Sequence, residues 1–115
     1  MADNCLFCKI ISGDIPGTIV HRDEDATAFR DINPVAPTHI LIVPNRHIDS
    51  VNTLEGDDEK LVGHLHRVAG QLAKSEGIDQ TGYRLITNTG PDAGQTVFHL
   101  HVHLIGGRTM KHPMG

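Results

Sequence analysis

Residues 97–105 read VFHLHVHLI, and over most of this stretch histidine alternates with an apolar side chain. Successive side chains of a β-strand point to opposite faces of a sheet. We therefore predict a strand from Val97 to Ile105 whose apolar positions face a core. The histidine positions are expected to line the other face, about 7 Å apart. They are His99, His101 and His103.

Four further segments have the composition of strands. Thr18–Arg22 and Ala26–Ile32 flank an acidic turn, which predicts a hairpin. His39–Val43 is a short run, apolar after its first residue, that Pro44 ends, and Tyr83–Asn88 provides the remaining strand.

One long helix is predicted between Asp57 and Gly77. Asp57 and Asp58 are expected to supply the N-cap and the acidity of its first turn, and Gly77 ends it. Its apolar residues recur with a period of 3.6 and form one stripe: Leu61, Val62, Leu65, Val68, Ala69, Leu72 and Ala73. A second, short helix is expected over Cys5–Ser12.

These elements predict an α+β fold, an antiparallel sheet of about five strands with the long helix on one face. The 115 residues suffice for one domain, residues 1–115, of which residues 106–115 form a tail. The second face of the sheet stays partly uncovered in this arrangement, which favours a ligand or a second copy there.

Composition narrows the function classes. The net charge of −4 gives no general electrostatic footprint for nucleic acid or a membrane surface. Met1–Asn4 carries no secretory signal and no apolar run is long enough to span a membrane, so a cytoplasmic location is expected. Nine histidines are many for a chain of 115 residues.

A row of imidazoles suits either metal binding or phosphate chemistry. The segment that precedes the row, Asn88–Thr96, is rich in glycine and small polar residues, so its backbone N–H groups can approach an anion. This adjacent segment favours phosphate chemistry over metal binding as the function of the histidine row.

The histidine row resembles the signature of the histidine-triad (HIT) superfamily. Further similar motifs are Phe7–Ile11 with Ile15-Pro16, Ala28–Pro34, Ala36–His39, Pro44 with His47-Ile48, and Gly106–Arg108. The last of these is similar to the branch of nucleotide-binding phosphoramidases. The resemblance implies a HIT-like fold, homodimers with one continuous sheet, and hydrolysis of P–N bonds in purine nucleoside 5′-phosphoramidates without a catalytic cofactor.

The resemblance also implies roles for individual residues. His101 would be the nucleophile that carries the nucleotide covalently, His103 would bind phosphate oxygens, and His39 would support them. Asp31 would bind the ribose. The phosphate and leaving-group side would be lined by Asn88, Gly94, Gln95 and Thr96. The apolar wall around the purine would be formed by Leu6, Phe7, Ile10, Phe29 and Ile32.

The pair in CLFC, residues 5–8, is half of a tetrahedral zinc site. Two unrelated packed thiols remain an alternative, and a redox pair is disfavoured because no βαβ unit surrounds it. The resemblance implies a structural zinc held by Cys5, Cys8, His47 and His99. His21, His64 and His66 are interpreted as ordinary surface or edge histidines.

Two positions depart from the family pattern. Thr96 stands where many relatives have serine, and His112 where animal relatives have tryptophan. Three alternative functions remain open. They are a non-catalytic nucleotide-binding or partner-binding module, a metalloenzyme that uses all three histidines of the row, and a dinucleoside polyphosphate hydrolase or nucleotidyltransferase.

Overall fold

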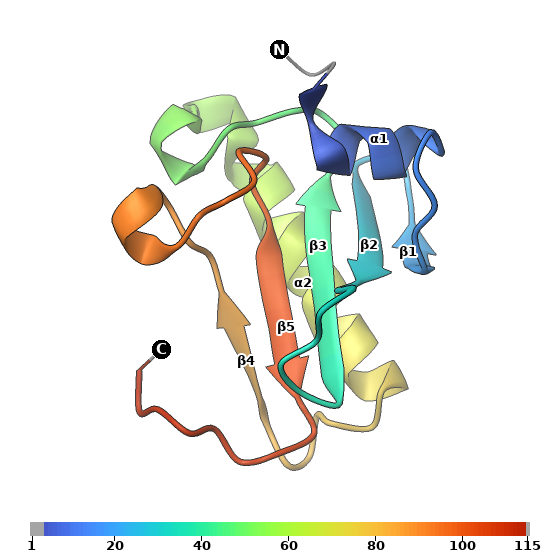
Figure 1. Cartoon of the computed structure of the whole chain (residues 1–115), viewed down its shortest axis with the longest axis vertical. Coiled ribbons are helices and arrows are strands. Elements are labelled where there is room, and N and C mark those ends of the chain that lie inside the picture. The colour runs from blue at the N-terminus through green and yellow to red at the C-terminus, as the bar shows by residue number, and fades with distance from the viewer. Residues whose placement is uncertain (1–3, 115) are drawn as a thin grey trace.

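A five-stranded antiparallel sheet forms the centre of the computed structural model, which describes residues 4–114 (Figure 1). The spatial order is β1-β2-β3-β5-β4. The bounds are β1 Ile19–Arg22, β2 Ala26–Arg30, β3 Thr38–Pro44, β4 Tyr83–Ile86 and β5 Val102–Gly106. Met1–Asp3, part of the segment considered for a signal, and Gly115, the end of the predicted tail, lie outside the described residues.

The two α-helices lie on different sides of this sheet. The long helix α2, Glu59–Ser75, crosses behind the sheet, and the short helix α1, Leu6–Ser12, lies near the end of β3 (Figure 1). The predicted α+β class is therefore confirmed. No helix within residues 4–114 is long and apolar enough to cross a membrane.

Strand β3 is buried along its whole length and divides the core in two. Ile40 and Ile42 pack with the apolar stripe of α2, whereas Leu41 and Val43 pack on the other face. The second cluster also holds Cys5, Phe7, Ile10 and Phe29. The first cluster includes Leu100, Val102 and Leu104, so the predicted core face of the histidine segment is confirmed.

The predicted strand Val97–Ile105 is wrong in its first five residues, because β5 begins only at Val102. Val102 pairs with Ile42, two residues before β3 ends at Pro44. Beyond that pair the Pro44 carbonyl accepts a hydrogen bond from the ring of His99 at 2.8 Å instead of extending the ladder between β3 and β5. Proline has no N–H to donate, so the ladder stops here.

Other predicted boundaries shift by one or two residues. Strand β2 ends at Arg30 rather than Ile32, and β4 ends at Ile86 rather than Asn88. The carboxylate of Asp58 accepts from the Glu55 N–H at 2.8 Å and makes no side-chain cap to α2.

Candidate active site and metal centre

A cleft of about 650 Å³ lies on the sheet face opposite α2. Two residues of the histidine row, His101 and His103, line it together with Thr96. All five predicted wall residues also line the cleft, and Ile32 at 91% exposure marks its rim. The sequence alone assigned no site role to the remaining lining residues, which are Ile15, Pro16, Gly17, Thr18, Arg30, Asn33, Leu41 and Val97.

The ring of His101 is held in one tautomer by the backbone. Its Nδ1 lies 2.7 Å from the carbonyl oxygen of His99. A carbonyl only accepts, so Nδ1 carries the proton and Nε2 keeps its lone pair. Burial lowers the pKa of His101 from 6.5, which keeps the ring neutral near pH 7. Phe7 packs edge-on against this ring at a centroid distance of 5.0 Å.

A chain of hydrogen bonds fixes the opposite tautomer in His103. The Val35 N–H donates to His39 Nδ1 at 3.2 Å, so the proton of neutral His39 sits on Nε2. That Nε2–H donates to His103 Nδ1 at 3.0 Å. The proton of His103 is therefore on Nε2. Burial, with His101 and His39 beside it, lowers the pKa of His103 to about 4, so this ring is neutral as well.

Asp31 lies in the cleft lining beside this chain. One carboxylate oxygen accepts from the Asn33 N–H at 2.8 Å, and the other is 3.4 Å from His39 Nε2. Burial lowers the pKa of His39, and the negative charge of Asp31 partly opposes this. Asp31 thus contacts His39 as well as lining the cleft.

Of the glycine-rich loop, the structure brings only Thr96 into the cleft lining. Gln95 is buried, and its side chain closes the loop instead: it accepts from the Gly90 N–H at 2.9 Å and donates to the Asp49 carbonyl at 2.9 Å. Asn88 and Gly94 are not among the lining residues. Gln95 therefore positions the loop that carries Thr96.

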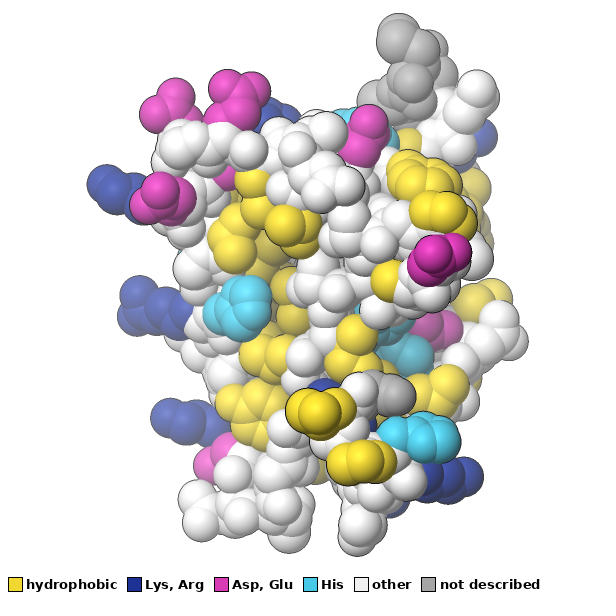
Figure 2. All heavy atoms as spheres, turned by 90° about the vertical axis from the view of Figure 1, so that its left-hand side faces the viewer, with side chains coloured by type: hydrophobic (Ala, Val, Ile, Leu, Met, Phe, Trp, Pro, Cys, Tyr) yellow, Lys and Arg dark blue, Asp and Glu magenta, His cyan; other side chains and the backbone are white. Residues whose placement is uncertain are grey.

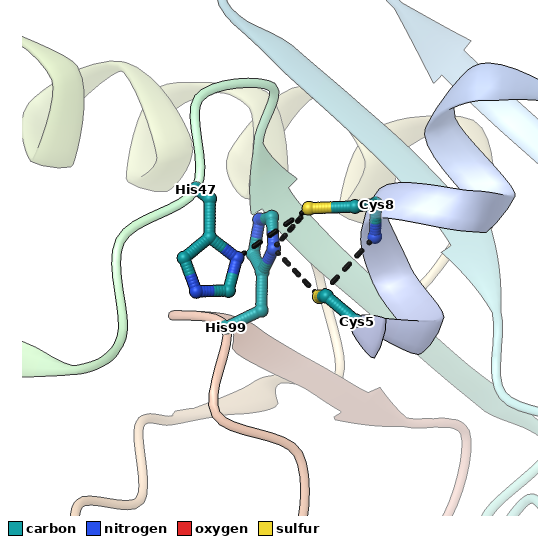
Figure 3. A group of neighbouring side chains, drawn as sticks. All are labelled: Cys5, Cys8, His47 and His99. Carbon is teal, nitrogen blue, oxygen red and sulfur yellow. Dashed lines mark hydrogen bonds between the residues drawn. The ribbon is translucent and has the colours of Figure 1, made fainter. Parts of the chain in front are cut away.

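The first histidine of the row belongs to a different cluster. Figure 3 shows Cys5 and Cys8 from the start of α1 pointing toward the rings of His47 and His99. His99 Nδ1 lies 3.3 Å from Cys5 Sγ and 3.5 Å from Cys8 Sγ, and His47 Nδ1 lies 3.4 Å from Cys8 Sγ. All four donor atoms lie within 4.8 Å of one another.

This donor set fits a tetrahedral zinc ion. The His99 Nε2–H donates to the Pro44 carbonyl, and the His47 Nε2–H bonds an Asp49 carboxylate oxygen at 2.7 Å. Both Nδ1 lone pairs therefore face the sulfurs. Zn–S and Zn–N bonds of usual length place tetrahedral neighbours roughly 3.5 Å apart, close to the spacing seen. Burial and the neighbouring Cys5 raise the pKa of Cys8 to about 11 where no metal is bound.

Two partly exposed histidines outside these clusters share one carboxylate. The Nε2 atoms of His21 and His64 lie 2.6 and 2.7 Å from the same Asp23 carboxylate oxygen. These contacts, with two backbone N–H bonds to its other oxygen, hold the pKa of Asp23 well below its usual range despite burial. His64 therefore joins the β1–β2 turn to α2, His21 contacts the same carboxylate from β1, and His66 is exposed as expected.

The side chains that could bind a metal form separate groups, and the histidines of the row are divided between them. His99 falls with the two cysteines, and His103 falls with Asp31 and His39. Within the part of the chain that the structure describes, no such group holds His99, His101 and His103 together. The hypothesis of a metal bound by all three therefore finds no support in this geometry.

A family model described as the HIT domain matches residues 12–110, and the chain belongs to this family. A purine nucleoside phosphoramidase of Escherichia coli K12 is 50% identical over 110 residues, 96% of this chain and 92% of that protein.

Solved structures agree with this assignment. A HIT family hydrolase from Legionella pneumophila Philadelphia 1 superposes with a TM-score of 0.94 at 49% identity, covering 97% of this chain and all of that one. A histidine triad protein from Clostridium difficile gives 0.92 at 47% identity, with 95% of each chain covered.

Proposed function

We propose that this protein is a hydrolase that cleaves the P–N bond of purine nucleoside 5′-phosphoramidates through a covalent intermediate on His101. One observation carries the proposal: His101 offers a bare Nε2 in the same cleft where His103 offers an Nε2–H. The two rings are 4.9 Å apart by their centroids. A nucleophile and a hydrogen-bond donor thus lie beside each other.

The proposed reaction has two displacements at phosphorus. His101 Nε2 forms a bond to phosphorus while the P–N bond of the substrate breaks, and the departing amine takes up a proton from solvent. A water oxygen then forms a bond to phosphorus while the bond between phosphorus and Nε2 breaks. The water gives up one proton to solvent, the nucleoside monophosphate is released and the ring is neutral again. His103 Nε2–H stabilises the charge on the phosphoryl oxygens in both steps. The Thr96 hydroxyl is assigned to the leaving-group side.

The apolar part of the cleft suits a purine base. Phe7, Ile10 and Phe29 form its buried wall, and Asp31 supplies a carboxylate that can accept hydrogen bonds from ribose hydroxyls. His39 keeps His103 in its donating tautomer. Under this proposal Asn88, Gly94 and Gln95 shape the loop next to the phosphate.

A zinc ion is proposed at Cys5, Cys8, His47 and His99, with a structural role. When bound, zinc would tie the start of α1 to the segment that precedes β5 by coordinating the thiolates and both Nδ1 atoms. The residues of this cluster are not assigned to the displacement at phosphorus.

A homodimer through strand β4 and a cytoplasmic location complete the proposal. Strand β4 pairs with β5, and no other strand described within residues 4–114 pairs with it. Figure 2 shows hydrophobic side chains gathered in a band on the β4 side of the molecule, with Lys, Arg, Asp and Glu around it. Cys5 and Cys8 form no disulfide, and the cytoplasm keeps cysteines in this reduced state.

The test is AMP release from an adenosine 5′-phosphoramidate of an alkylamine, measured for the wild type and for His101→Ala. We expect wild-type turnover and a loss of at least about 10⁴-fold in the variant. Binding of AMP without turnover by either protein would favour the non-catalytic module. Equal activity of both proteins would exclude His101 as nucleophile. Comparison with a dinucleoside polyphosphate separates the phosphoramidase from the dinucleotide hydrolase.

A further inference from the structure

The tail makes a two-donor contact with the loop between β2 and β3. Arg108 donates from Nε at 3.2 Å and from Nη2 at 2.9 Å to the same carbonyl oxygen, that of Val35. Its Nη1 donates to the Thr109 carbonyl at 3.0 Å. Gly107 lies so close that a Cβ there would stand 2.9 Å from a Pro37 side-chain carbon. The tail is therefore seated directly on this loop.

The residue held by Arg108 is the one that sets the His39 tautomer. The Val35 N–H donates to His39 Nδ1, and His39 donates in turn to His103. Val35 is 56% exposed, so packing of its side chain does little to fix its backbone. The hydrogen bonds at its N–H and its carbonyl therefore carry much of its orientation.

We propose that Arg108 is a positioning residue for the histidine pair. By holding the Val35 carbonyl it keeps the Val35 N–H on His39 Nδ1, and His103 thereby keeps its proton on Nε2. If the contact is lost, His39 can take the other tautomer, and the proton of His103 can move to Nδ1. His103 would then present a lone pair to the phosphate. This inference rests on the proposed function and adds a role for the tail.

The experiment compares Arg108→Gln with Arg84→Gln. Arg84 also holds the tail, through a 3.4 Å bond from Nη2 to the Pro113 carbonyl, but this bond does not involve Val35. Nitrogen-15 spectra of the imidazole rings report the tautomers of His39 and His103 directly. We expect Arg108→Gln to mix both tautomers and to lower kcat roughly tenfold with KM little changed. Arg84→Gln should match the wild type in the tautomers of both rings.

Arg108→Lys keeps the positive charge with one donor nitrogen in place of the two that reach Val35, and we expect it to recover part of kcat and of the original tautomer. Thermal unfolding of each variant verifies that the fold is retained. Wild-type tautomers in Arg108→Gln overturn the proposal, with or without a fall in kcat. If the wild type releases no AMP, the proposed function fails, whereas the spectra still decide whether Arg108 sets the tautomers.

Discussion

The candidate metal cluster (Cys5, Cys8, His47 and His99) and the cleft take neighbouring histidines from one short stretch and use opposite ring atoms. At His99 the Pro44 carbonyl occupies Nε2, which leaves Nδ1 facing the two cysteines. At His101 the His99 carbonyl occupies Nδ1, which leaves Nε2 facing the cleft. The difference shows that the backbone partner decides what each imidazole can do, although the residue type and the face of the chain are the same.

The comparison predicts that a substitution in one region changes the properties of that region and leaves those of the other intact. Cys8→Ser removes one thiolate from the metal cluster, so bound zinc should fall well below one per chain by atomic spectroscopy. The free energy of unfolding should drop by about 4 kcal/mol if free zinc exceeds its dissociation constant about 1,000-fold. Nucleotide affinity in the cleft should change little.

A chelator supplies the control for this prediction. Removal of zinc from the wild type should lower its stability toward that of Cys8→Ser and leave the variant unchanged. A wild-type protein that is purified with zinc available but carries none, and whose melting does not respond to chelator, contradicts the metal assignment.

The next largest effect is expected in the cleft. His103→Ala removes the proposed donor to the phosphoryl oxygens, so kcat for AMP release should fall about 10²–10³-fold. Zinc content should stay at the wild-type value. His103→Gln retains an N–H donor and should recover part of the loss. Full activity of His103→Ala would place the charge-stabilising donor elsewhere.

The smallest effect concerns pH. Under the proposed mechanism His101 must be neutral to attack phosphorus, and burial lowers its pKa from 6.5. A lowered pKa means that the neutral fraction persists as the pH falls, so the acidic limb of kcat/KM should have its midpoint below pH 6.5. A midpoint at or above 6.5 would show that burial does not govern this ring. The measurement is AMP release between pH 4 and 8 in one buffer series.

Much of the fold could be predicted because local patterns are strong where one face is buried. The stripe of α2 and the alternation of Leu100, Val102 and Leu104 both follow from burial on the α2 side. The extent of the last strand did not follow, because strand pairing depends on the partner as well as on the pattern. The partner here is β3, which ends at Pro44.

The candidate site divides in the same way. Residue types and the family resemblance gave the groups that meet in the cleft and around the cysteines, whereas hydrogen-bond partners came only from the structure. Gln95 is the clearest case, because its amide binds the backbone of Gly90 and Asp49 rather than lining the cleft. The contact between Arg108 and Val35 joins residues 73 positions apart and has no local signal.

The bond from His101 to the carbonyl of His99 has a consequence for how this protein can vary. If a side-chain carboxylate accepted the hydrogen bond from His101 Nδ1, a single codon change could remove it. Every residue type at position 99, by contrast, carries a backbone carbonyl. Point mutation therefore has no direct way to delete the group that orients the proposed nucleophile. Mutation reaches it only by bending the chain, for instance through loss of the side-chain bonds that hold His99.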